Sequence, residues 1–179
     1  MMQDLTMHLL ELLMNAVAHK AKLLKVEITN NTKLNRIFFK VVDDGEGMSE
    51  EVLKSVTDPF VTTRSTRKIG MGLAFLKSLI DQTDGHVEIK SKLNVGTEIN
   101  FDVRMDHIDL PPLGNIGEMF ATVYNANPDI KIDFKYIYDE KVFDYNQLSI
   151  EDEVGSLDYN DINILFWIKD YINEGIKNL

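Results

Sequence analysis

The sequence predicts an α+β fold, built from amphipathic helices and antiparallel β-hairpins. Residues 4–22 repeat leucines at helical spacing, and residues 71–85 form a second such pattern that ends at Gly85. Other short runs alternate apolar and polar residues, as half-buried strands do. At 179 residues, the chain suits one domain, or one domain with a smaller attachment.

The remaining elements follow in order along the chain. The expected strands are residues 25–29, 36–43, 86–91 and 97–103, with a further hairpin over residues 130–145. The expected shorter helices are residues 49–57, about 116–126 and about 160–176. Residues 58–70 show little periodicity, so we expect a loop there.

The composition argues against several classes of protein. The absence of cysteine excludes disulfides, thiolate zinc sites and cysteine-ligated iron–sulfur clusters. A net charge of −10 argues against general nucleic-acid binding, which needs a cationic surface. No apolar run approaches the roughly 20 residues that cross a bilayer, and the N-terminus lacks a basic leader before an apolar core. We therefore expect no membrane partner, and a cytoplasmic location is the default.

The charge is divided unevenly along the chain. Residues 1–104 hold 14 Lys/Arg and 14 Asp/Glu, whereas residues 105–179 hold 5 and 15. Between the two sections, Pro111-Pro112 stops regular structure. We therefore expect two units, residues 1–106 and a small acidic α+β C-terminal extension over residues 107–179. On this division, a chain cut after Met105 is expected to stay soluble.

The extension contains aromatic residues that alternate or recur at element spacing. This pattern favours a hydrophobic core, and an exposed partner-binding surface is the alternative. The residues are Phe134, Tyr136, Tyr138, Phe143, Phe166 and Trp167.

A polar stripe runs along the first predicted helix. A stripe of this kind is usually a solvated face. A carboxylate and an amide one turn apart can also act together, because the amide oxygen is a neutral Mg²⁺ ligand and the carboxylate can take a proton from water. The stripe covers roughly 80° of arc and consists of His8, Glu11, Asn15 and His19.

The predicted loop is rich in cations and hydroxyls and leads into a helix. Glycines at a helix N-terminus let backbone N–H groups approach an anion, so the segment suits a polyphosphate. An exposed basic loop is the alternative. The spacing matches neither the Walker phosphate loop nor the Rossmann glycine motif. The residues are Thr62, Thr63, Arg64, Thr66, Arg67 and Lys68, followed by Gly70 and Gly72.

A strand ends at Asp43-Asp44 and is followed by Gly45 and Gly47. Taken alone, this stretch could be an ordinary turn, because glycine tolerates positive φ and aspartate hydrogen-bonds its own backbone.

Together, these segments resemble the GHKL ATPase superfamily of histidine kinases, type II topoisomerases, mismatch-repair ATPases and anti-sigma-factor serine kinases. "ELLMNAVAHKA" (11–21) looks like the N box and "DDGEGM" (43–48) like the G1 box. "DPFVTTR" (58–64) is similar to the F box, "GMGLAFLKSLI" (70–80) to the G2 box, and "GTEINFDV" (96–103) to the final Gly-Thr strand. The resemblance covers about residues 5–104. It implies a two-layer α/β sandwich of the Bergerat type with a mixed, largely antiparallel sheet.

The resemblance also implies the site residues. Asp43 would accept a hydrogen bond from the adenine amino group, with Thr97 near the water-bridged ring nitrogen, and the glycines after Asp43 would keep the pocket floor open. Asn15 would bind Mg²⁺ and Glu11 would be the catalytic base. The implied ATP-binding residues are Asn15, Asp43, Gly45, Gly47, Met48, Thr62, Thr63, Arg64, Lys68, Gly70, Met71, Gly72, Leu73 and Thr97.

Three features depart from the family pattern. Lys68 replaces the usual first glycine of the G2 box, and the chain begins almost at the N box, without the strand that normally precedes it. No helical segment with a phosphoacceptor histidine is recognised, so we do not expect a complete sensor kinase. Glu11 is typical of hydrolysing members and serine kinases, whereas the lid resembles that of histidine kinases.

The expected function is therefore Mg-ATP binding with slow hydrolysis or phosphotransfer to a partner protein, in a regulatory protein for which a homodimer is one option. The alternative is a non-catalytic ATP-sensing module whose lid presents or hides a binding surface. A fragment of a DNA-topology or mismatch-repair ATPase is disfavoured, because residues 107–179 are short and acidic.

Overall fold

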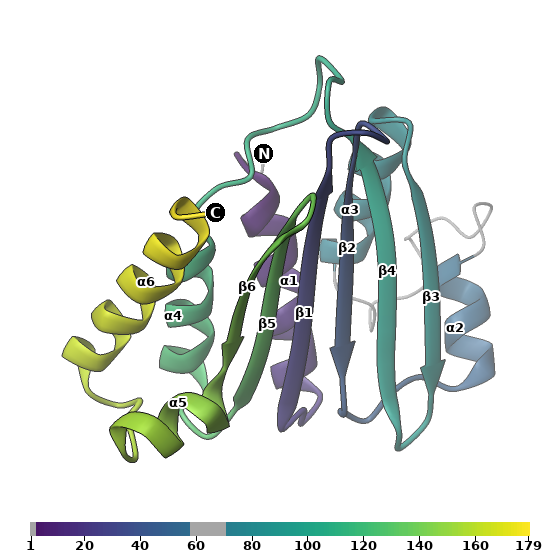
Figure 1. Cartoon of the computed structure of the whole chain (residues 1–179). Helices are drawn as coiled ribbons and strands as arrows, with labels where there is room; N and C mark the ends of the chain where they lie inside the picture. Colours follow the sequence, from purple (N-terminus) through teal and green to yellow (C-terminus); the bar gives the residue numbers. More distant parts are fainter. Residues whose placement is uncertain (1–2, 58–70) are drawn as a thin grey trace.

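The computed structural model describes residues 3–57 and 71–179 and shows a sheet covered by helices (Figure 1). Six strands form one sheet in the order β3-β4-β2-β1-β5-β6. The strands are β1 (Leu23–Asn31), β2 (Arg36–Asp43), β3 (His86–Lys92), β4 (Gly96–Arg104), β5 (Lys131–Tyr138) and β6 (Lys141–Asn146). The helices are α1 (Leu5–Ala18), α2 (Glu50–Thr57), α3 (Met71–Gln82), α4 (Ile116–Ala126), α5 (Gln147–Val154) and α6 (Ile162–Lys177).

The sheet is mixed and largely antiparallel. All neighbouring strands run antiparallel except β1 and β5, which run parallel. In β1, the side chains of Leu24, Val26 and Ile28 are buried on one face, whereas Lys25 and Glu27 lie on the other. The long helices cover the face that carries the buried side chains (Figure 1). The predicted α+β sandwich is therefore confirmed.

The acidic C-terminal section shares this sheet and its core. Strand β5 lies beside β1, where Ile132 and Phe134 are buried, and α4 packs against both α1 and α6. The linker is also tied to α1, because the carbonyls of Pro112 and Leu113 accept the N–H groups of Leu5 and Thr6 at 2.9 Å. The sheet and the core continue across residue 106. The division of the chain into two units at that residue therefore stays a prediction about function.

Some boundaries differ from the predicted ones for local reasons. Helix α1 ends at Ala18 instead of residue 22, because Lys20 adopts a positive φ of 65° that a helix cannot continue through. Helix α5 was not predicted. It buries only Gln147 among its own residues and so gives no apolar period, but the Asn146 side chain caps its start by accepting the Ser149 N–H at 2.9 Å.

None of the helices that the structure describes combines the length and the apolar character needed to cross a bilayer.

Candidate functional site

The described site residues come together at one end of the sheet, beside α1. Asp43 ends β2 and is the direct cross-strand partner of Thr97 at the start of β4. The loop after Asp43 meets the C-terminal end of α1, where the Glu46 N–H donates to the His19 carbonyl at 2.9 Å. Helix α3 begins against α1, because a Cβ added to Gly72 would lie 2.9 Å from the Cβ of Glu11. Residues from four elements therefore surround one region.

Asp43 is a partly buried carboxylate. Its Oδ1 accepts the N–H of Gly45 at 2.9 Å. Burial raises the pKa of Asp43, and this effect exceeds the lowering by the backbone N–H groups of Gly45 and Thr97. Such a carboxylate is an acceptor with little competing water, which is what recognition of an amino group requires.

The neighbouring Asp44 has a different role. Its Oδ1 accepts the backbone N–H groups of Lys22 and Leu23 at 2.7 and 2.9 Å, which fixes the entry into β1. The side chain is exposed. Asp44 is therefore a structural residue, which supports Asp43 as the candidate ligand-binding aspartate.

Ser91 is a site residue that the sequence reasoning missed. Its Oγ lies 2.9 Å from Thr97 Oγ1, 3.0 Å from the Gly96 carbonyl and 2.8 Å from the N–H of Met48. With the Ser91 proton directed to the Gly96 carbonyl, the Thr97 hydroxyl can donate to Ser91 and use its lone pairs as acceptors. The pairing of Ser91 with Thr97 across the β3–β4 hairpin could have identified it.

The glycines let the loop and the hairpin pack backbone against backbone. Gly47 has a φ of +62°, and a Cβ on it would lie 2.1 Å from the Lys92 carbonyl oxygen. Gly96 has a φ of +129°, and a Cβ there would lie 2.0 Å from the Asp43 carbonyl oxygen. Their described role is close packing. Direct contact of Gly45 or Gly47 with a nucleotide stays a prediction.

Substitution Gly47→Ala is therefore expected to lower the free energy of unfolding by about 2 kcal/mol or more, through a left-handed backbone and a clash with Lys92. Urea unfolding measures this. Gly155→Ala is a control for backbone strain without a clash, because Gly155 has φ 93° and ψ 173° but its Cβ would have no atom within 4 Å. A Gly47 variant as stable as the wild-type protein would contradict the packing role.

The polar stripe on α1 separates into different environments. Glu11 is exposed and Asn15 is partly buried, and neither side chain makes a hydrogen bond or an ion pair with another described residue. His19 is exposed, with Nδ1 lying 2.8 Å from the Asn15 carbonyl oxygen. His8 is buried, and burial lowers its pKa. Within the stripe, Glu11 and Asn15 thus combine the right chemistry with polar atoms that no described residue uses.

Several predicted residues cannot be placed in the same way. Met71 is the first residue of α3, and Leu73 packs, partly buried, against the core. The others lie outside the described residues, and their predicted phosphate contacts stay predictions: Thr62, Thr63, Arg64, Lys68 and Gly70.

The residues also fit a metal ion that would be held mainly by the phosphate oxygens of a bound nucleotide. Within the described ranges, no three His, Asp or Glu side chains gather into a metal site. Asn15 would supply one neutral oxygen, and phosphate oxygens and water would supply the others, as Mg²⁺ prefers.

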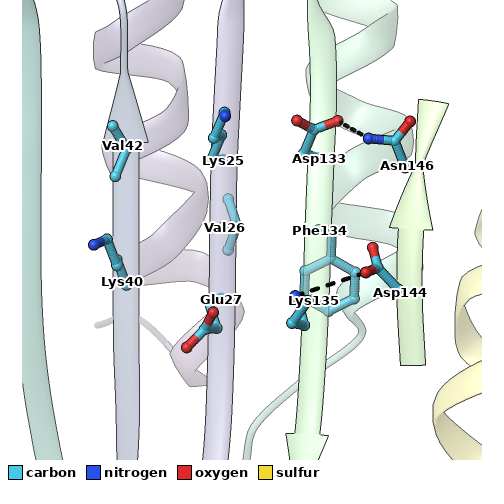
Figure 2. Close-up of a pocket in the computed structure, with 10 residues that line it drawn as sticks. All are labelled: Lys25, Val26, Glu27, Lys40, Val42, Asp133, Phe134, Lys135, Asp144 and Asn146. Atoms are coloured by element: carbon cyan, nitrogen blue, oxygen red, sulfur yellow. Dashed lines mark hydrogen bonds and ion pairs between the residues drawn. The ribbon is translucent and has the colours of Figure 1, made fainter. Parts of the chain in front are cut away.

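A separate hollow of about 320 Å³ lies on the opposite face of the sheet (Figure 2). Charged and polar side chains of β1, β2, β5 and β6 line much of it, and two pairs among them interact with each other. Lys135 lies 3.7 Å from Asp144, and Asn146 donates to Asp133 at 2.8 Å. This hollow is not part of the site beside α1.

Comparison with known proteins identifies the family. Residues 3–107, more than half of the chain, match the family described as histidine kinase-, DNA gyrase B-, and HSP90-like ATPase. The chain belongs to this ATPase family, which confirms the predicted superfamily and implies that it binds a nucleotide.

The curated relatives are sensor kinases much longer than this chain. Sensor histidine kinase YvrG of Bacillus subtilis is 35% identical over 92 residues, which are 49% of this chain and 16% of that protein. Sensor protein KdpD of Clostridium acetobutylicum is 31% identical over 100 residues, which are 53% of this chain and 11% of that protein. The chain thus spans less than a fifth of either relative.

A solved structure shares the fold. The Aquifex aeolicus MutL ATPase domain complexed with ADP is similar with a TM-score of 0.51 at 16% identity, over 86% of this chain and 68% of that one. Since 86% of the chain is more than residues 3–107, the shared fold includes part of the C-terminal section.

Proposed function

We propose that this protein is a regulatory Mg-ATP-binding protein that hydrolyses ATP slowly or transfers its terminal phosphoryl group to a partner protein. The observation that carries the proposal is the pair of polar side chains on α1, Glu11 and Asn15, which lie beside the start of α3 and have no side-chain partner among residues 3–57 and 71–179. A member of an ATPase family needs a base and a metal ligand next to the phosphates, and these two residues have that chemistry.

Each described residue has a separate role in this proposal. Asp43 accepts the adenine amino N–H, and the Thr97 hydroxyl accepts from a water beside the ring. Ser91 and Gly45 orient these two groups through their own hydrogen bonds. Asn15 holds Mg²⁺, which neutralises phosphate charge when it is bound. Glu11 takes a proton from the attacking water or hydroxyl.

The segment outside the described residues completes the proposed site. Its cations and hydroxyls would contact the phosphates, and a lysine in place of the usual glycine adds a further cation. These residues are Thr62, Thr63, Arg64, Lys68 and Gly70.

Substitution Asp43→Asn tests the adenine contact. Asparagine has a single side-chain oxygen, and the Gly45 N–H already uses one oxygen at this position. The variant would therefore either turn its NH₂ toward the adenine amino group or lose the bond to Gly45. ATP affinity is expected to fall by about tenfold or more. Calorimetric titration with ATP measures the affinity.

Asp44→Asn is the matched control. It makes the same chemical change one residue away and keeps an oxygen for the N–H groups of Lys22 and Leu23, so binding should persist. Equal affinity of the two variants for ATP would contradict the role of Asp43.

A further inference from the structure

The outer face of α6 exposes large apolar side chains that the core does not use. The inward face of the helix is formed by Leu165, Ile168 and Ile172, which are buried. On the outer side, Ile162 and Phe166 are each 56% exposed, Trp167 is 39% exposed and Tyr171 is 38% exposed. Exposed apolar side chains gathered on one helix are typical of an interaction site.

Two of these aromatic residues pack against other aromatic rings of the protein. The Trp167 ring stacks on Tyr171 with centroids 5.2 Å apart, and Tyr171 in turn contacts Phe143 and Tyr145 of β6 at 5.9 and 6.3 Å. Side chains that are already ordered lose little conformational entropy when a partner binds them. Trp167 and Tyr171 are therefore suitable anchors for binding.

Two carboxylates lie among these aromatic residues. Asp170 follows Phe166 by four positions and Trp167 by three, and Glu174 follows Tyr171 by three, so each lies one helical turn away. Both are exposed, and within the described residues neither forms an ion pair. Lys169 on the same helix is instead paired with Glu118 of α4 at 3.0 Å. Among the described residues, these two carboxylates thus form no ion pair, although Lys177 follows Glu174 by three positions.

The charge of the whole section has the same sign. Residues 105–179 hold 5 Lys/Arg against 15 Asp/Glu. A second copy of the chain would bring two such acidic surfaces together, which like-charge repulsion opposes. A nucleic acid is disfavoured for the same reason. A cationic ligand with an apolar side is favoured.

We propose that this surface, hereafter the α6 surface (Ile162, Phe166, Trp167, Asp170, Tyr171 and Glu174), binds a basic amphipathic helix of a partner protein. The apolar side of that helix covers the aromatic residues, and its lysines or arginines reach Asp170 and Glu174. An arginine can also stack on the face of Trp167. Helix α6 lies at the opposite end of the sheet from α2 and α3 (Figure 1), so the α6 surface shares no residue with the proposed nucleotide site.

Trp167 is the one tryptophan of the chain and therefore reports directly on this surface. The probe is a designed helical peptide of lysine and leucine, about four turns long, with leucines along one face. We expect saturable binding with a blue shift of the Trp167 emission, weakened by salt. A peptide of the same length and pattern, with glutamate in place of lysine, should not bind. Equal binding of the two peptides would contradict the proposal.

Matched variants distinguish binding at the α6 surface from non-specific electrostatic or hydrophobic binding elsewhere on the protein. Asp170→Asn with Glu174→Gln should weaken binding by about tenfold or more, whereas Glu50→Gln with Glu51→Gln makes the same charge change on α2 and should not. Phe166→Ala should weaken binding, and Leu34→Ala, which removes another exposed apolar side chain, should not.

Two results would overturn the proposal. One is that the Asp170→Asn/Glu174→Gln variant and the Phe166→Ala variant bind the lysine and leucine peptide as tightly as the wild-type protein does. The other is a Trp167 blue shift that depends on protein concentration without peptide, which would mean that a second copy covers the surface. ATP affinity of the same variants is measured in parallel and should be unchanged, so a failed surface is distinguished from a failed nucleotide site.

Discussion

A chain cut after Met105 is expected to be insoluble or unfolded. The cut removes β5, which exposes the edge of β1 along its whole pairing with β5. It also removes the helix that covers α1, together with buried side chains such as Phe120 and Phe134. Because an ordinary domain is stable by only about 5–15 kcal/mol, the loss of several buried side chains is expected to prevent folding. Size-exclusion chromatography and circular dichroism of the purified fragment measure this result.

The control is a chain that is cleaved but not shortened. Ile108 in the linker is 94% exposed, so a protease site introduced beside it should be cut without disturbing the sheet. The two pieces should stay together and still bind ATP. A soluble fragment of residues 1–105 with full ATP affinity would show instead that the first section folds alone, as the sequence predicts.

Glu11→Ala and Asn15→Ala are expected to fail in different ways. Without Glu11, Mg-ATP should still bind, while turnover falls by roughly 10²-fold or more because the base is gone. Without Asn15, Mg²⁺ should no longer strengthen ATP binding, because the proposed protein ligand is lost. Calorimetric titration with and without Mg²⁺, together with a turnover assay, separates the two effects.

Met7→Ala is the control for these variants, because Met7 is also exposed on α1, one turn before Glu11, and carries neither a base nor a metal ligand. It should bind and turn over ATP like the wild-type protein. If all three substitutions had equal and small effects on ATP binding and turnover, Glu11 and Asn15 would belong to a solvated helix face with no part in the chemistry.

Local patterns predicted much of the fold. The alternation of apolar and polar residues located the strands of the first section, and the hairpin turn at Asp139 was also recovered, where φ is +53°. The role of Asp43 came from the family resemblance and not from the local pattern, and the structure sets Asp43 directly opposite Thr97.

The parts that the sequence did not predict depend on contacts between distant residues. No local pattern says that Phe134 pairs in register with Val26, so the parallel β1–β5 pairing was not foreseen. His8 belongs to a polar stripe in sequence, yet packing around α1 buries it. Ser91 acts through a cross-strand contact with Thr97, which only the hairpin register shows.

The most direct test is the turnover of γ-labelled ATP by the wild-type protein and by Glu11→Ala, at saturating Mg-ATP, with binding confirmed for both. We expect slow phosphate release from the wild-type protein and roughly 10²-fold less from the variant. Equal release from the two proteins would contradict the role of Glu11. The protein would then be better described as a module that senses ATP without consuming it.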